Sequence, residues 1–133
     1  MIGMKKDWSI GAIIGDLVPG ASWVIRDNDF NTLEWFSTDK TPPTLEQIET
    51  RKAELEAVEP MRMLREIRDW YLDNTDWTQV QDLRNIRGPA WCAAWDAYRQ
   101  QFRDLPVAMQ GKLYLDQNNN LAGAVWPTQP IQQ

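Results

Sequence analysis

The sequence predicts an α+β fold, in which a small N-terminal α-β-β-α unit precedes an antiparallel helical hairpin and a short C-terminal β-hairpin or extended tail. Apolar residues recur every three or four positions between Met61 and Pro106, which is typical of amphipathic helices. Apolar and polar residues alternate in two runs between Trp23 and Trp35, which is typical of strands. Clusters of Asn and Asp predict the hairpin turns.

The N-terminal unit is expected over residues 1–58. Ser9 is a suitable N-cap for a helix over residues 10–18, which the Pro-Gly pair that follows would stop. The two alternating runs meet at Asp27-Asn28-Asp29, whose residue types tolerate left-handed backbone and predict a hairpin. Because a lone hairpin is only marginally stable in water, we expect a neighbouring helix to cover one of its faces.

The apolar run IGAIIG, with two lysines ahead of it, has some features of a secretory signal. Asp7 and Asp16 bracket this run and no small-residue cleavage site follows it, so we favour an amphipathic helix. No stretch of the sequence approaches the roughly 18 apolar residues that a membrane span needs. We therefore expect the protein to make no use of a membrane.

The helical hairpin is predicted over residues 59–110. Ahead of it, Thr44 and Gln47 form a capping box for a helix. Pro60 suits the first turn of a helix, so one helix is expected to end near Ala57 and a second to begin near Pro60, with a kinked continuous helix as the alternative. The second helix of the hairpin is expected to start at Gly88-Pro89 and to end at Pro106.

Facing apolar stripes on the two hairpin helices can bury each other. The stripes are formed by Leu64, Ile67 and Tyr71 on the first helix and by Trp91, Trp95, Tyr98 and Phe102 on the second. We expect Trp91 and Trp95 to be buried against Leu64 and Ile67. Trp77 or Trp126 is expected to be more exposed.

Residues 111–133 are expected to form a β-hairpin or an extended tail. The short runs KLYL and LAGAVW flank a polar segment that begins at Asp116 and imitates the opening of a calcium-binding EF-hand loop. The required Gly and Glu are replaced by Leu121 and Pro127, so a hairpin turn is favoured. The last residues, TQPIQQ, have nothing to bury, and we expect only a partner to order them.

Composition narrows the possible functions. The net charge of −5, with no basic cluster longer than Lys5-Lys6, argues against nucleic-acid binding. The sequence has no histidine and a single cysteine, Cys92, so we expect no zinc site, no Cys/His catalytic pair and no cofactor. Carboxylates alone can catalyse, but the sequence does not distinguish an acid–base pair among Asp69, Asp73 and Asp76 from solvated acids at a helix end.

The eight tryptophans are the unusual feature of the composition. Two interpretations stay open, since Trp fills protein cores and is also enriched at the centres of interfaces. Two interpretations also stay open for Arg99 and Arg103, which share a helical face and potentially oppose Asp69 or Asp76. They belong either to an inter-helix salt network or to a docking surface of Trp, Tyr and Arg.

A series of motifs runs through MRMLREIRDWYLDNTDWTQVQD, WDAYRQQFRDLP and VWP. An Arg-Asp helix leads into a Thr-Asp-Trp corner, a Trp-x-x-Tyr-Arg-Gln helix ends in Arg-Asp-Leu-Pro, and a Trp-Pro pair follows. This series resembles the bacteriophage tail assembly chaperone family and its relatives among tail-fibre assembly proteins. The upstream segments PGASWVIRDNDFNTLEW and PPTLEQIE are similar to a segment that often precedes this domain. The matching positions are Arg68, Asp69, Leu72, Thr75, Asp76, Trp77, Thr78, Trp95, Tyr98, Arg99, Gln100, Arg103, Asp104, Leu105, Pro106, Trp126 and Pro127.

The resemblance implies a non-enzymatic protein that acts in the host cytoplasm, binds a tail-fibre or other tail polypeptide of its phage, and assists its folding, oligomerisation or attachment. Two departures from the family pattern, in residues 84–93 and around KLYLDQNNN, would retune the partner surface or favour a structural accessory retained in the mature virion on the tail fibre or baseplate. Homo-oligomerisation and an enzyme of phage metabolism or lysis are further alternatives. The residues expected to contact the partner are Trp70, Trp77, Tyr98, Arg99, Phe102, Arg103 and Trp126.

Overall fold

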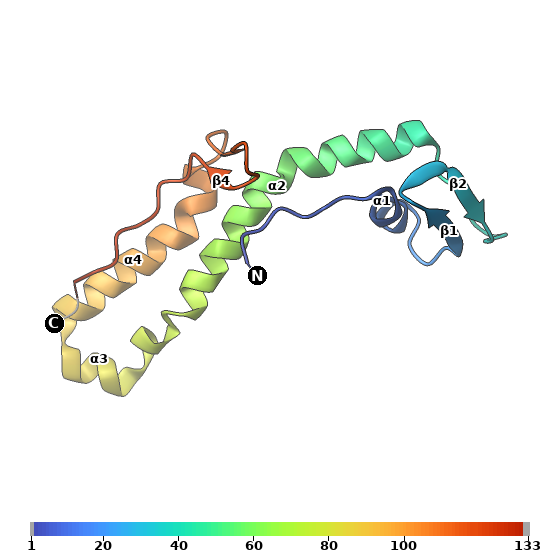
Figure 1. The fold of residues 1–133 in the computed structure, drawn as a ribbon. Helices are drawn as coiled ribbons and strands as arrows, with labels where there is room; N and C mark the ends of the chain where they lie inside the picture. The colour runs from blue at the N-terminus through green and yellow to red at the C-terminus, as the bar shows by residue number, and fades with distance from the viewer. Residues whose placement is uncertain (1, 132–133) are drawn as a thin grey trace. The chain divides into compact units, whose positions relative to one another are not determined.

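Helices and two small antiparallel sheets alternate along the chain in the computed structural model, which describes residues 2–131 (Figure 1). This order confirms the predicted α+β class. The chain forms two compact units, which are considered separately below. We call Lys6–Glu59 the N-terminal unit, and Pro60 onward, together with the residues before Lys6, the aromatic unit.

The N-terminal unit begins with helix α1 (Ile10–Leu17), whose N-cap is Ser9 as predicted: its Oγ accepts a hydrogen bond of 3.2 Å from the backbone N–H of Ala12. Strands β1 (Trp23–Arg26) and β2 (Asp29–Trp35) then pair antiparallel. Asp27 and Asn28 turn the chain between them with a φ of 54° each, which confirms the predicted hairpin.

The core of the N-terminal unit is aliphatic. Ile13 and Ile14 from α1 and Ile48 from the first turns of the next helix are almost fully buried. Trp23 and Trp35, directly opposite each other on the hairpin, pack against these three isoleucines. Helices therefore cover one face of the hairpin, as its marginal stability alone requires.

Helix α2 (Leu45–Asp73) begins with the predicted capping box. The N–H of Gln47 donates to Thr44 Oγ1 at 3.1 Å, and the N–H of Thr44 donates to Gln47 Oε1 at 2.9 Å. The predicted break near Ala57 is wrong, and the alternative of one helix through Pro60 is correct. Proline removes one backbone hydrogen bond, but the segments on both sides are rich in strong helix formers, so the helix continues.

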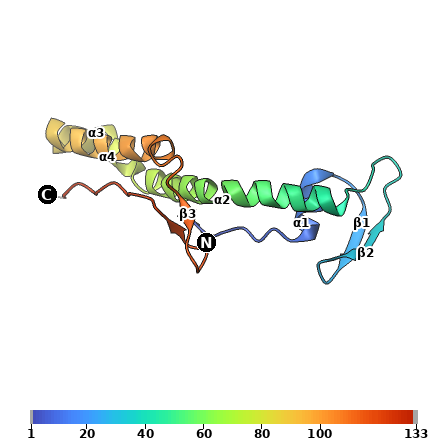
Figure 2. The same ribbon diagram turned by 90° about the horizontal axis from the view of Figure 1, so that it is seen from above.

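The aromatic unit contains the rest of α2 and three further helices: the 3₁₀ helix η1 (Asp76–Gln79), α3 (Gln81–Arg87) and α4 (Pro89–Ala108). Helix α4 lies beside the C-terminal half of α2 and runs in the opposite direction, which confirms the predicted helical hairpin (Figures 1 and 2). Its core consists of Leu64, Trp95, Tyr98, Phe102, Leu105 and Met109.

Two helix boundaries in the aromatic unit differ from the prediction. Helix α3 was not predicted, because it buries none of its side chains and so has no apolar periodicity to detect. Helix α4 begins at Pro89 as predicted but passes Pro106 and ends at Ala108. Pro106 is buried in the last turns of the helix, where the loss of one backbone bond is tolerated.

The predicted order of tryptophan exposure is confirmed. Trp95 is 1% exposed and Trp91 is partly buried, whereas Trp77 and Trp126 are 43% and 38% exposed. Leu64 belongs to the same core as Trp95. Ile67 instead lies so close to Gly3 that a Cβ on this glycine would come within 2.8 Å of the isoleucine side chain.

The end of the chain forms the short strands β3 (Tyr114–Leu115) and β4 (Leu121–Ala122), which pair antiparallel as the predicted C-terminal hairpin. An extended segment follows and reaches Ile131. The expectation that TQPIQQ has nothing to bury is wrong at Pro130, which is partly buried and lines a cavity with Trp91 and Trp95. Residues 132–133 of this segment lie outside the described residues.

Candidate functional site

Arg99 organises the corner at which α2 ends. Its guanidinium is buried, and Nη1 donates to the carbonyl oxygen of Leu72 and to Thr75 Oγ1, each at 2.7 Å. Nη2 forms an ion pair of 2.9 Å with Asp76, whose side chain stays largely exposed. A side chain from α4 therefore satisfies backbone and side-chain oxygens that the end of α2 leaves without helical partners.

Two threonines complete this corner. Thr75 Oγ1 donates to the carbonyl oxygen of Tyr71 at 2.8 Å, and the fully buried Thr78 donates its hydroxyl to the carbonyl oxygen of Thr75 at 2.7 Å. The Thr-Asp-Trp-Thr segment is thus held from inside by hydrogen bonds. This fixes the direction in which Trp77, between Asp76 and Thr78, leaves the backbone.

A second arginine locks α3 onto α4. Arg84 donates from Nη1 and Nη2 to the two carboxylate oxygens of Asp96, at 2.9 and 2.8 Å, and also reaches the carbonyl oxygen of Thr78 at 3.2 Å. The hydrogen bond from Arg84 lowers the pKa of Asp96 below its usual value, against the opposing effect of burial, and a bond from Gln79 adds to the lowering. The same bond raises the pKa of Arg84.

Aromatic side chains form a continuous row through the unit, which we call the aromatic row. Neighbouring ring centroids lie between 4.8 and 6.4 Å apart. The row passes through Trp77, Trp91, Trp95, Tyr98, Phe102 and Tyr71 and divides at its end into Trp70 and Trp126. Buried rings occupy the middle and exposed tryptophans both ends, so the core of the unit reaches its surface without interruption.

The structure divides the seven predicted partner contacts into two groups. Trp70, Trp77 and Trp126 are exposed at the ends of the aromatic row, and Arg103 is exposed on α4. Tyr98, Arg99 and Phe102 are buried in the framework beneath them. Burial raises the pKa of the Tyr98 hydroxyl, with a further contribution from Tyr71. The buried group positions the exposed side chains and has little surface of its own to offer in this conformation.

Sequence reasoning missed Arg84 as a member of this framework. Arg84 lies on α3 and pairs with Asp96 on α4. Helical periodicity relates residues within one helix, so it does not predict a pair between two helices. Arg99 pairs with Asp76, one of the two acids that the sequence left open as its partner. Arg103 instead approaches Gln100 at 3.4 Å on its own helix.

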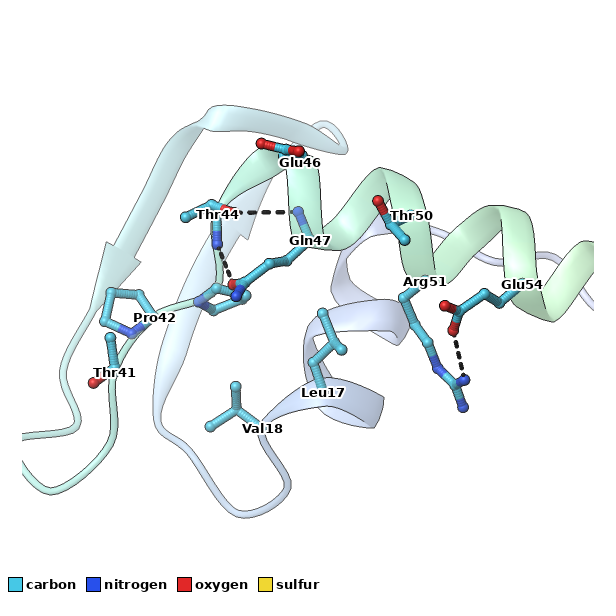
Figure 3. A pocket seen from close by; sticks show the side chains of 11 residues that line it. Leu17, Val18, Thr41, Pro42, Thr44, Glu46, Gln47, Thr50, Arg51 and Glu54 are labelled. Carbon is cyan, nitrogen blue, oxygen red and sulfur yellow. Dashed lines mark hydrogen bonds and ion pairs between the residues drawn. The ribbon is translucent and has the colours of Figure 1, made fainter.

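A hollow in the N-terminal unit has a volume of about 720 Å³ and lies between the end of α1, the loop through Pro42 and the first turns of α2 (Figure 3). Several polar residues that line it already have partners within the unit. Thr44 and Gln47 form hydrogen bonds with each other, and Arg51 forms ion pairs with Asp16 and Glu54. The paired acids raise the pKa of Arg51. We find in it no reason to place the functional site there.

The described part of the chain holds no group of three or more His, Cys, Asp or Glu side chains that are placed to bind a metal ion. Asp116, which opens the segment that imitates an EF-hand, accepts backbone hydrogen bonds from Asn118 and Asn120 at 2.8 and 3.0 Å. Within residues 2–131, each helix is too short or too polar to cross a bilayer.

Comparison with known protein families identifies the aromatic unit. A family model described as phage tail assembly chaperone protein matches residues 61–131. The chain belongs to this family. Its membership gives the protein a role in phage tail assembly, and the match begins one residue after Pro60, where the aromatic unit begins. Neither the curated proteins nor the solved structures contain a match to this phage tail assembly chaperone.

The structure brings the family motifs together although they lie far apart along the chain. The Thr-Asp-Trp corner and the Tyr-Arg-Gln helix meet at Arg99, which bonds the corner, while Trp126 of the late Trp-Pro pair returns to Tyr71 and Phe102. These motif residues therefore act together as a framework. The exposed edges of this framework are the candidate partner surface.

Proposed function

We propose that this protein is a non-enzymatic chaperone that binds a tail-fibre polypeptide of its phage in the host cytoplasm and assists its folding, oligomerisation or attachment. The family match over the aromatic unit carries the proposal. A fibre that assembles from several chains transiently exposes apolar surface, which aggregates unless it is covered. A chaperone for such a chain needs an apolar surface that is itself stable in water.

The ends of the aromatic row suit this task. Trp70, Trp77 and Trp126 are each about two-fifths exposed, and ring contacts with buried or partly buried neighbours hold them in place. Because their rotamers are already restricted, burying them against a partner costs little further entropy. Tryptophans that are anchored in this way are typical of interface hot spots. The net charge of −5 disfavours unwanted association with other acidic surfaces.

The placement of the acids supports a non-enzymatic role. Asp69, Asp73 and Asp76, the three carboxylates that an acid–base mechanism would need, are all exposed to solvent. Asp69 pairs with Arg68 and Asp76 with Arg99. Exposed carboxylates of this kind lack the enclosed environment in which carboxylates act as general acids and bases.

Co-expression with the tail-fibre polypeptide of the same phage tests the proposal. We expect the fibre to be soluble and trimeric with the wild-type chaperone, and mostly insoluble with a variant that carries both Trp70→Ser and Trp126→Ser. Val107→Ser is the matched control, because Val107 is an exposed apolar residue outside the aromatic row. A fibre that is equally soluble and trimeric without this protein would contradict the proposal.

Quantitative mass spectrometry of purified virions separates a chaperone from a retained structural accessory. A protein that acts only during assembly is expected to be absent from purified particles. A fixed stoichiometry to the fibre or baseplate would identify it as a virion component instead.

A further inference from the structure

The C-terminal segment of residues 124–131, which we call the tail, has an unusual burial period. It is neither helix nor strand, and every third residue is partly buried: Ala124, Pro127 and Pro130. The residues between them are exposed. Three residues per turn is the period of the polyproline II helix, and the tail carries two prolines at the matching spacing, in Pro-Thr-Gln-Pro.

The tail lies on an aromatic surface. Trp126 contacts Tyr71 and Phe102, with ring centroids 6.2 and 6.4 Å apart. Farther along, Pro130 and Ile131 line a cavity of about 330 Å³ together with Arg87, Ala90, Trp91, Ala94 and Trp95. The tail therefore follows α4 from the level of Phe102 back toward its N-terminal turns (Figure 1). Aromatic grooves that accept polyproline II segments are a recurring mode of peptide recognition.

The start of the tail is fixed, whereas its end is lightly held. Gly123 has a φ of +86°, and a Cβ there would overlap the carbonyl oxygen of Lys112, so this position requires glycine. The next residue but one, Val125, donates its N–H to Met109 Sδ at 3.4 Å. At the far end Ile131 is 86% exposed although it lines the cavity. A segment anchored at one end and loosely packed at the other can leave its groove without unfolding the unit.

We propose that the groove along α4, from Phe102 to Trp91, binds an extended polyproline II segment of the partner polypeptide that carries proline or a small apolar residue at every third position. The chain's own tail occupies this groove until such a segment takes its place. The tail of the chain indicates the chemistry of the ligand, because it shows which residues the groove accepts and at what spacing. The inference rests on the proposed chaperone function and names what that chaperone recognises.

A labelled peptide with the sequence of residues 124–131, AVWPTQPI, is the probe, and fluorescence polarisation with the full-length chain is the measurement. In the wild type the tail competes with the peptide. The full-length double variant Pro127→Ala, Pro130→Ala has a weaker tail, so we expect it to bind the peptide about 5- to 10-fold more tightly than wild type. The double variant Thr128→Ala, Gln129→Ala alters the exposed residues between the prolines and should bind like wild type.

A substitution in the groove completes the test. Ala94→Lys, added to the Pro127→Ala, Pro130→Ala background, places a long side chain with the same charge as Arg87 on the cavity wall, at an exposed helical position and without removing a core side chain. We expect it to weaken peptide binding at least about 10-fold, since the longer side chain occupies space beside Trp91 and Trp95 and its charge is costly to bury under the peptide. Unchanged binding by this variant, equal affinity of wild type and the proline variant, or no binding to either would overturn the inference.

The peptide measurement and the fibre measurement fail independently. If the chaperone keeps the fibre soluble but the peptide does not bind, the groove inference is wrong and the proposed function stands. If the peptide binds as expected but the fibre is soluble without this protein, the groove is real and the proposed chaperone function is wrong.

Discussion

The two units of this protein solve the same packing problem with different side chains. In the N-terminal unit a hairpin and two helical segments bury three isoleucines, Ile13, Ile14 and Ile48. In the aromatic unit α2 and α4 are joined mainly by rings, with Trp95, Tyr98 and Phe102 at the centre. A buried aliphatic side chain is too small to reach the surface as well, so it cannot contact a partner. A row of aromatic rings extends farther, so its middle belongs to the core and its ends lie at the surface. The same side chains therefore stabilise the unit and offer a surface to a partner.

The units also differ in how their helices are capped. In the N-terminal unit Ser9 and Thr44 cap α1 and α2 from within three residues of the groups that they bond. In the aromatic unit the end of α2 is capped by Arg99, which lies 27 residues from Leu72 and 24 from Thr75. A local cap stabilises one helix. A distant cap couples two helices, so its loss affects the whole unit.

The most severe test of an aromatic core is the removal of its central ring. Trp95→Ala is expected to lower the free energy of unfolding by about 3–5 kcal/mol, because it deletes a side chain that is 1% exposed and contacts three other rings of the row, those of Trp77, Trp91 and Tyr98. Trp77→Ala is the matched control and should cost only about 1 kcal/mol, since that ring is already partly in water. Urea unfolding measures both, and equal losses would contradict a core centred on Trp95.

Removal of the distant cap is expected to have the next largest effect. Arg99→Met leaves the carbonyl oxygen of Leu72 and the hydroxyl of Thr75 without their charged donor, which should cost about 2–3 kcal/mol. Arg103→Met makes the same change at an exposed position one turn along α4, and should stay within about 0.5 kcal/mol. Amide hydrogen exchange should also show faster exchange at the end of α2 in Arg99→Met alone. Similar behaviour of the two variants would mean that the corner does not depend on Arg99.

A single methyl group tests the aliphatic unit. Ile14→Val is expected to lower the stability of the N-terminal unit by about 0.5–1.5 kcal/mol, because it leaves a small cavity at a fully buried position. Ile86→Val, at a position that is 81% exposed, is the control and should have no measurable effect. Hydrogen exchange resolves the change by region. Loss of protection in α4 rather than in α1 and β2 would show that the two units do not unfold separately.

The fold could be predicted from the sequence where stability is local. The Ser9 cap, the Asp27-Asn28 turn and the Thr44 capping box each depend on residue types within a few positions, and each is confirmed. The course of the chain through Pro60 was predicted only as the alternative, because a helix break depends on the balance between one lost hydrogen bond and the propensity of two long flanking segments. Local sequence rules describe the lost hydrogen bond well, but they describe the summed helix propensity of long segments less well.

The candidate site shows the other side of this limit. The exposure of Trp77 and Trp126 followed from their place outside the helical stripes. Periodicity also placed Tyr98 and Phe102 on the buried face, and their selection as partner contacts rested on residue type instead. The roles of Arg84 and Pro130 could not be predicted, because each depends on a contact between segments that are distant along the chain. The period of three in the tail involves only three partly buried residues. It can be recognised once their burial is known, but the sequence alone does not reveal it.

The smallest expected effect concerns the pair that locks α3 onto α4. Because Arg84 lowers the pKa of Asp96 in the folded state, the pair contributes stability at pH values above the ordinary Asp pKa of about 4 and loses it as the pH falls through the lowered value. The Asp96 side chain is 48% exposed, so screening should keep the contribution below about 1 kcal/mol. Asp96→Asn should therefore be less stable than wild type at pH 7, and the difference should shrink toward pH 3. In an Arg84→Met background the same substitution should have a much smaller pH dependence, because only the weaker effects of Gln79 and Arg99 on Asp96 remain. Urea unfolding at both pH values can measure this difference. A pH-dependent loss of the same size without Arg84 would show that Asp96 responds mainly to another group, and that its pair with Arg84 does not stabilise the contact between α3 and α4.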